Sequence, residues 1–305
     1  MPSLPQIAPA PALAPSAIES ERARRNRGTL LIVAAALLWS SGGLILRSVA
    51  VDSWTVIFWR STASGLFLLM FLMIVERRRP LALFRAGGWP IVVTGVCFAV
   101  GSVSFVTALS LTTVANALMI QSLSPLIAGF MGLILMGERV RLQTWVAIAI
   151  ALLGIAVMMG RLPQGEDLVG TLLSFLNAFA FAGATVNIRY NRTVRMIPAA
   201  CIAAAIGAMV ALPLATPLAP SFDALALLWF FGAGQLAVGM ILFMTGARLL
   251  PAAQTSLLSL LEVILGPLWV WLVYGEDPGL FVLAGGLIVM VALAGHTVLD
   301  RAAWR

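Results

Sequence analysis

Long apolar runs, separated by short connections that contain polar residues and arginines, make up the chain from residue 29 onward. A membrane-spanning helix needs about 20 mainly apolar residues, because lipid offers no hydrogen bonds to an open backbone. This rule predicts ten transmembrane helices. Their predicted ranges are Thr29–Leu46, Trp54–Val75, Trp89–Leu111, Val114–Met136, Leu142–Met159, Leu168–Ile188, Pro198–Thr216, Ala224–Ala247, Pro251–Tyr274 and Gly279–Leu299.

The arginines supply an independent indication of topology. All 19 basic residues are arginines, and cytoplasmic loops of membrane proteins carry the excess of positive residues. With the N-terminus inside, ten spans place sixteen arginines on the cytoplasmic side. Arg47 and Arg161 then lie outside, and Arg60 lies within a span. Both termini are therefore expected to be cytoplasmic.

The two halves of the chain resemble each other. Ala115–Glu138 aligns with Ala253–Glu276 at an offset of 138 residues, and each half contains five predicted helices. Because five is odd, the second copy has to enter the membrane from the opposite side, as in the inverted repeats of secondary transporters. We expect an all-α fold with a disordered cytoplasmic tail (1–28), a first repeat (29–160), a second repeat (161–299) and a short cytoplasmic C-terminal tail (300–305).

A stripe of small and polar residues follows one face of the fourth and ninth predicted helices. The stripe consists of Ala117, Gln121, Ser124 and Ala128, and of their repeat counterparts Thr255, Ser259, Glu262 and Gly266. Small residues at this spacing also allow close helix packing, which is the alternative interpretation. Packing alone does not require the amide of Gln121 or the carboxyl of Glu262. We predict that Gln121, Ser259 and Glu262 line a central cavity.

Two charged residues lie within the spans. Glu262 is the acidic residue near the centre of a span, where a charge costs at least about 2.5 kcal/mol unless water, a partner or a proton compensates it. Arg60 lies at a similar predicted depth. The two form either a structural ion pair or a site in which Arg60 binds a carboxylate and Glu262 faces an ammonium group. Glu262 is also the predicted proton carrier if transport is proton-coupled.

Further polar and aromatic residues lie at plausible depth. Trp39 and Trp59 are predicted to contact substrate, although membrane tryptophans often anchor at the interface. Asn116, Asn177 and Gln235 are also candidate binding residues, with helix-to-helix hydrogen bonding as the alternative. The prolines Pro125 and Pro267 interrupt the fourth and ninth predicted helices, and each marks a candidate bend or gate.

Composition excludes several classes of protein. The chain has 305 residues, of which 61% are hydrophobic and 10% charged, against roughly 25% charged in a soluble domain. Two cysteines and one histidine predict no metal site, no cofactor and no enzymatic centre. The net charge of +7 comes from arginines between apolar runs, so no nucleic-acid partner is expected.

Several short motifs resemble a known family. They are Leu37–Ser41, Phe58–Arg60, Ala108–Thr113, Ser124–Pro125 and Gly137–Glu138, repeated in the second half as Leu261–Val263 and Gly275–Glu276. This pattern resembles the EamA-type ten-helix branch of the drug/metabolite transporter superfamily. The family often has proline where Val263 stands. The resemblance implies transport of small metabolites, often amino acids leaving the cell, across a bacterial inner membrane.

The expected function is therefore that of an inner-membrane secondary transporter working by alternating access. An amino acid or related zwitterion is the predicted substrate, and export is favoured. The alternatives are uptake of a vitamin, nucleoside or cationic metabolite, and a non-transporting accessory protein. The expected partners are a small-molecule substrate and the lipid bilayer, and the sequence leaves a homodimer open.

Overall fold

The protein is helical wherever the structure describes regular elements. The computed structural model describes residues 15–49, 51–75, 80–111, 117, 120–137, 140–159, 168–275 and 279–302. Seven of its helices are long and apolar enough to cross a membrane, and three shorter apolar helices bring the number to ten. The prediction of an all-α protein with ten apolar helices is confirmed, and it indicates a multi-pass membrane protein.

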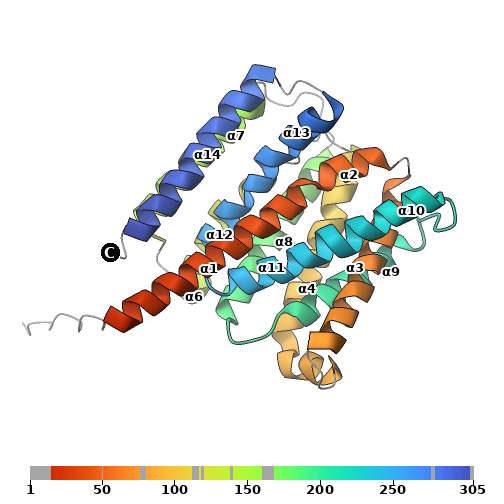
Figure 1. The fold of residues 1–305 in the computed structure, drawn as a ribbon, viewed down its shortest axis with the longest axis horizontal. Coiled ribbons are helices and arrows are strands. Elements are labelled where there is room, and N and C mark those ends of the chain that lie inside the picture. Colours follow the sequence, from red (N-terminus) through yellow and green to blue (C-terminus); the bar gives the residue numbers. More distant parts are fainter. Residues whose placement is uncertain are drawn as a thin grey trace, which may run out of the picture.

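The helices overlap the predicted ranges but differ from several of their bounds and contain additional breaks (Figure 1). In chain order they are α1 (Pro15–Ser40), α2 (Gly42–Ser48), α3 (Ser53–Val75), α4 (Pro80–Leu111), α6 (Ser124–Met136), α7 (Leu142–Met159), α8 (Leu168–Tyr190), α9 (Ile197–Ala211), α10 (Phe222–Trp229), the π-helix η1 (Phe230–Ala237), α11 (Val238–Ala247), α12 (Ala252–Ser259), α13 (Leu261–Tyr274) and α14 (Gly279–Ala302). Several predicted spans are therefore composed of two or three shorter elements.

The first helix starts earlier than expected. α1 begins at Pro15, so residues 15–28, which we expected to be disordered, are helical. Proline suits the first helical turn, because its missing N–H would have no partner there. Glu21 pairs with Arg24 at 2.6 Å and with Arg25 at 3.4 Å, and such pairs one turn apart stabilise a helix. Residues 1–14 lie outside the described part of the chain.

Three predicted spans are interrupted by turns. The first breaks at Ser41, where the hydroxyls of Ser40 and Ser41 donate to backbone carbonyls one turn back and compete with the helical backbone. A turn at residues 122–123 precedes α6, and a turn at Leu260 separates α12 from α13. Residues 122 and 260 are 138 positions apart, which is the offset of the sequence repeat.

Helices from the two halves of the chain pack against each other. α3 lies along α9, α4 lies along α8 and α9, and α1 lies along α11. The hydroxyls of Thr55 and Thr216 are 3.1 Å apart, and a Cβ added at Gly65 would lie 3.3 Å from the Cβ of Ala204. Residue numbers therefore rise along α3 while they fall along its neighbour, so α3 and α9 run antiparallel.

Glycines bring the paired helices close together. A Cβ added at Gly95 in α4 would lie 2.8 Å from the Cβ of Ile202 in α9. A Cβ added at Gly232 in η1 would lie 2.7 Å from the Cβ of Ala63 in α3. Both distances are shorter than carbon atoms tolerate. Lipid tails are as apolar as leucine, so close packing of this kind is what associates helices in a membrane.

α7 and α14 form a separate pair at the edge of the molecule (Figure 1). The Thr144 hydroxyl of α7 lies 3.0 Å from Nε2 of His296 in α14, which joins the two helices. Their other faces expose large apolar side chains, including Leu142, Leu153, Leu280, Leu287 and Val291. Such faces suit contact with lipid, and they leave the remaining eight spans to enclose the polar interior.

Candidate functional site

The guanidinium group of Arg60 is held in the interior of the bundle. Its Nη2 donates a hydrogen bond of 2.7 Å to Oγ of Ser102 in α4. Its Cζ lies 5.2 Å from the centre of the Phe231 ring in η1, within the range of a cation–π interaction. The buried Nε has no hydrogen-bond partner in the described part of the chain. Arg60 is therefore held in place by its contacts, and its buried Nε–H donor is unused within the described residues.

Glu262 lies in the first turn of α13, directly after the break at Leu260. The positive end of the helix dipole stabilises a negative charge at this position. Arg60 is the charged group that interacts with its carboxyl. Within the described residues, however, no nitrogen of Arg60 comes within 4.0 Å of an oxygen of Glu262. The two groups are close enough to interact electrostatically but form no direct ion pair.

Both charged side chains lie among the helices without being fully buried. Arg60 and Glu262 are each half-buried. A charge in such a place is costly unless a polar neighbour or water compensates it. The arrangement is typical of groups that border a polar space inside a helix bundle.

The π-helix η1 positions one side of this site. π-Helical turns within α-helices often occur at functional sites. Gly232 of η1 packs against the carbonyl of Arg60, and Phe231 lies beneath the guanidinium. One turn later, Nε2 of Gln235 donates a 2.9 Å hydrogen bond to the carbonyl of Trp39, close to the break between α1 and α2. Gln235 therefore connects η1 to the interrupted first span.

Gln121 and Asn177 form a second polar pair. Nδ2 of Asn177 in α8 donates a 3.1 Å hydrogen bond to Oε1 of Gln121, which precedes the turn before α6. A Cβ added at Gly101 in α4 would lie 3.1 Å from Oδ1 of Asn177. Gly101 directly precedes Ser102, the hydrogen-bond partner of Arg60. The amide pair therefore lies against α4, the same helix that Arg60 contacts. The structure thus brings together residues that are far apart in the sequence.

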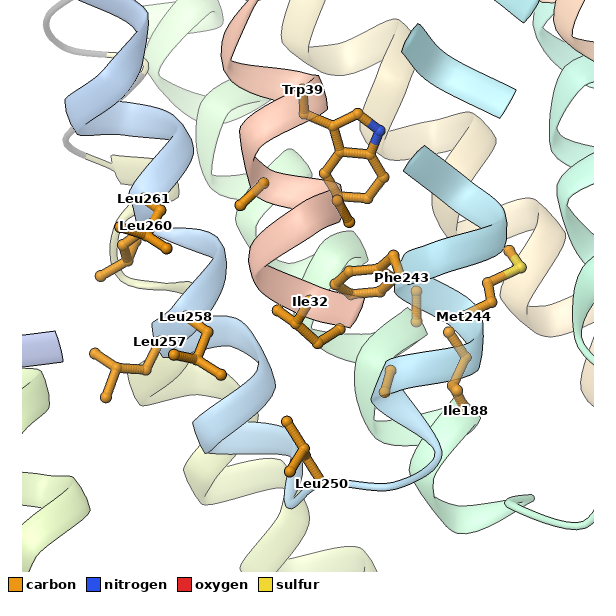
Figure 2. Packing of buried hydrophobic residues seen from close by; sticks show 14 of the residues in the cluster. Ile32, Trp39, Ile188, Phe243, Met244, Leu250, Leu257, Leu258, Leu260 and Leu261 are labelled. Atoms are coloured by element: carbon orange, nitrogen blue, oxygen red, sulfur yellow. The ribbon is translucent and has the colours of Figure 1, made fainter. Parts of the chain in front are cut away.

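Other predicted site residues lie in packed surroundings. The Trp39 ring belongs to the apolar core and lies over Phe243, with ring centres 5.2 Å apart (Figure 2). The Ser259 hydroxyl donates to the carbonyl of Thr255 within α12. Asn116 lies outside the described residues. A contact of Trp39, Ser259 or Asn116 with substrate stays a prediction.

Trp59 belongs to a polar network at one end of α3. Its indole N–H donates a 3.1 Å hydrogen bond to the carbonyl of Pro217. Asp52 accepts hydrogen bonds from the Thr55 backbone at 2.9 Å and from the Thr216 hydroxyl at 3.1 Å. Partial burial raises the pKa of Asp52, but these hydrogen bonds outweigh it and hold the pKa below its usual value. The network fastens α3 to the connection that follows α9.

The two prolines occupy different positions relative to the breaks. Pro125 lies in the first turn of α6, directly after the turn at residues 122–123. Pro267 lies within α13, which continues through it, and the interruption of this span occurs earlier, at Leu260. A proline fits the first turn of a helix without loss of a hydrogen bond. A gating role for either proline stays a prediction.

Sequence reasoning did not find Ser102 and Phe231. Both residue types are common in apolar helices, and their importance comes only from their contacts with Arg60. The available signals were weak. Ser102 belongs to a Gly-Ser-Val-Ser segment in an otherwise apolar span, and Phe231 precedes a glycine-rich segment.

Replacement of Ser102 by alanine tests whether this hydroxyl positions Arg60. The Arg60 guanidinium would lose its 2.7 Å partner, and a hydrogen bond to a charged group contributes about 1.5–3 kcal/mol. We expect the apparent KM for a ligand that contacts Arg60 to rise about tenfold or more while the maximal rate changes less. Ser102→Thr keeps the hydroxyl and should retain most of the affinity. Equal KM values for wild type and Ser102→Ala would contradict a positioning role.

Ten apolar helices with a half-buried arginine and a half-buried glutamate among them indicate a multi-pass membrane protein with charged groups inside its bundle. The model of the EamA-like transporter family matches the chain twice, over residues 26–160 and 168–297. The chain belongs to this family, which consists of membrane transporters, and the resemblance found in the sequence is confirmed.

Two similar proteins have names that state what they transport. The chain is 26% identical over 277 residues to the pseudopaline exporter of Pseudomonas aeruginosa. The matched segment covers 87% of this chain and 94% of the exporter. It is 24% identical over 246 residues to the S-adenosylmethionine uptake transporter of Rickettsia bellii, with coverage of 79% and 82%. These relatives are transporters of the drug/metabolite type.

A solved structure shows the same fold. A crystal structure with a TM-score of 0.78 and 22% sequence identity covers 90% of this chain and 98% of its own. At this identity the likeness concerns the fold alone. The protein is therefore a transporter by family, and the substrate has to be inferred from its own residues.

Proposed function

We propose that this protein is a secondary carrier in a bacterial inner membrane that moves an amino acid or related zwitterion by alternating access. Export is the favoured direction, and both termini are cytoplasmic. The observation that carries the proposal is the pair formed by Arg60 and Glu262. The two side chains are of opposite charge type and interact electrostatically without a direct ion pair, and the Nε of Arg60 has no hydrogen-bond partner among the described residues.

Equivalent contacts in the two halves support a two-repeat architecture. The contact of Gly95 with Ile202 corresponds to the contact of Gly232 with Ala63. The two glycines are 137 residues apart and their neighbours 139, close to the 138-residue offset of the sequence repeat. Helix contacts correspond in the same way. α4 packs against α8 as α11 packs against α1, and α6 packs against α8 as α13 packs against α1.

A second pair of contacts shows the same correspondence. A Cβ at Gly101 would lie against Asn177, and a Cβ at Gly239 would lie against the indole of Trp39. The two glycines are 138 positions apart in the sequence, and so are the two residues that they approach. The equivalent helices α3 and α9 run antiparallel, as two copies inserted in opposite directions would. These observations support inverted repeats, in which exchange of conformations between the copies opens the site to alternate sides.

The chemistry of the site supports a zwitterionic substrate. The planar fork of arginine matches a carboxylate, and Phe231 and Ser102 keep the fork of Arg60 in one orientation. Glu262 provides the counter-charge for an ammonium group. The methionine part of S-adenosylmethionine, which one relative is named for, also carries a carboxylate and an ammonium.

A second candidate function is uptake instead of export. One relative is named as an exporter and another as an uptake transporter, so the family contains both directions. In that case Glu262 would hold a cationic metabolite, a vitamin or a nucleoside. A non-transporting accessory role would leave the interior charges without a purpose, and it is the least supported reading.

Replacement of Arg60 by alanine tests the proposed substrate class. We expect uptake of free amino acids into proteoliposomes to fall about tenfold to a hundredfold, because charged hydrogen bonds to the carboxylate are lost. The matching amino-acid amides, which lack this carboxylate, should lose less. Arg60→Lys, which keeps the charge but not the fork, serves as the control. Equal losses for acids and amides would contradict carboxylate recognition and favour a structural role.

A further inference from the structure

Four arginines gather where three spans end on one face of the bundle. The connection from α8 to α9 contributes Arg192 and Arg195, the end of α8 contributes Arg189, and the residue after α11 is Arg248. Nε of Arg248 donates a 2.6 Å hydrogen bond to the carbonyl of Arg192. Nη1 of Arg189 donates a 3.3 Å hydrogen bond to the carbonyl of Arg248. The two connections are thus tied together by the arginines themselves.

The positive charge of this cluster is not compensated at its centre. Within the described residues, no carboxylate oxygen lies within 4.0 Å of Arg192 or Arg248. Burial, and then repulsion by Arg195, lower the pKa of Arg248. The side chains of Arg192 and Arg195 are exposed. The guanidinium of Arg192 makes no hydrogen bond or ion pair with the described residues, so its donors are available to an external anion.

The start of α9 adds to the positive electrostatic potential of the arginine cluster. α9 begins at Ile197, two residues after Arg195, and its first N–H groups form the positive end of a helix dipole. The asymmetric distribution of arginines across a membrane requires only charge on the correct side. It does not require guanidinium groups tied together at the ends of spans. The fixed cluster therefore calls for a ligand of its own.

We propose that this cluster binds the phosphate headgroup of an anionic membrane lipid. The ends of α8, α9 and α11 lie where hydrocarbon gives way to headgroups, because each is the end of an apolar span. Guanidinium groups recognise phosphate with two parallel hydrogen bonds. Basic pockets between transmembrane helices on the cytoplasmic side bind such headgroups. The inference rests on the proposed orientation of the chain and not on the proposed substrate.

The test uses the purified full chain in detergent, titrated with phosphatidylglycerol or with phosphatidylcholine. Phosphatidylglycerol should raise the unfolding temperature, and phosphatidylcholine should not. Arg192→Gln should raise the half-maximal phosphatidylglycerol concentration about fivefold, since one arginine near an anionic lipid surface contributes about this factor. The fold should not change, because the exposed Arg192 side chain makes no hydrogen bond or ion pair with the described residues. Arg85→Gln removes the same charge at another exposed site and should leave the titration unchanged.

Arg248→Lys examines the fixed geometry. It keeps the charge but loses the tie to the Arg192 carbonyl, and it should weaken the effect of phosphatidylglycerol as Arg192→Gln does. Three results would overturn the proposal. They are an equal loss in Arg85→Gln, an undiminished lipid effect in Arg248→Lys, and a stabilisation by inorganic phosphate that matches that of the lipid.

Discussion

Glu262→Gln is expected to reduce transport about a hundredfold or more while the protein remains folded in the membrane. Glutamine has nearly the same shape as glutamate but cannot carry the negative charge or bind and release a proton. Arg60 would then lose the charge with which it interacts. A hydrogen bond from a substrate ammonium group to a charged carboxylate contributes about 1.5–3 kcal/mol, a factor of about ten to a hundred and fifty, and the loss of proton binding adds to this effect.

The measurement is flux into proteoliposomes across a pH series. If Glu262 is the proton carrier, the residual flux of Glu262→Gln should no longer depend on a pH gradient. Glu21→Gln offers a matched control, because this carboxyl lies near the N-terminal end of α1 and pairs with Arg24 and Arg25. Unchanged flux of Glu262→Gln at every pH would remove Glu262 from the mechanism. A loss of folded protein, measured by size-exclusion chromatography, would point to a structural role instead.

The sequence predicts the helices well, because an apolar run long enough to cross the hydrocarbon layer has to form a helix to satisfy its backbone hydrogen bonds. Leu142–Met159 has the same bounds in the structure as in the prediction, since polar or glycine-containing connections delimit the run on both sides. The breaks at Ser41 and Leu260 were missed. The two breaks lie inside apolar runs. Hydropathy does not distinguish one continuous helix from two shorter helices that follow each other across the membrane.

The charged residues of the site were predicted, but the groups that hold them were not. A charge inside a span is conspicuous, so Arg60 and Glu262 could be found from their positions alone. Ser102 and Phe231 become significant only through contacts between α3, α4 and η1. Such contacts between distant segments depend on how helices pack, which a single sequence does not reveal.

The correspondence between the halves also shows where their symmetry fails. The carbonyl beside Gly232 belongs to Arg60, and the carbonyl beside Gly95 belongs to Ala199. In the proposed two-repeat architecture, Arg60 and Ala199 occupy equivalent positions. The same backbone packing then carries a charged side chain in one repeat and a methyl group in the other. The proposed binding site is therefore asymmetric, although the proposed scaffold is shared.

This correspondence makes Gly232→Ala the most informative packing variant. The added Cβ would collide with the Arg60 carbonyl and lie 2.7 Å from the Cβ of Ala63, so η1 and α3 must separate. We expect a loss of about 1–3 kcal/mol in stability, the usual cost of overpacking. Transport should fall about tenfold or more, because the shift displaces the guanidinium from Ser102 and Phe231.

Gly95→Ala is the matched control, because it creates the equivalent collision in the repeat that lacks the charge. A Cβ there would lie 2.8 Å from that of Ile202 and 2.9 Å from the Ala199 carbonyl. Thermal unfolding should show similar destabilisation for both variants, whereas KM should rise mainly for Gly232→Ala. Gly43→Ala, with no atom within 4 Å of the added Cβ, should behave like wild type. Unaltered stability and transport in Gly232→Ala would show that the close contact between η1 and α3 does not hold Arg60 in place.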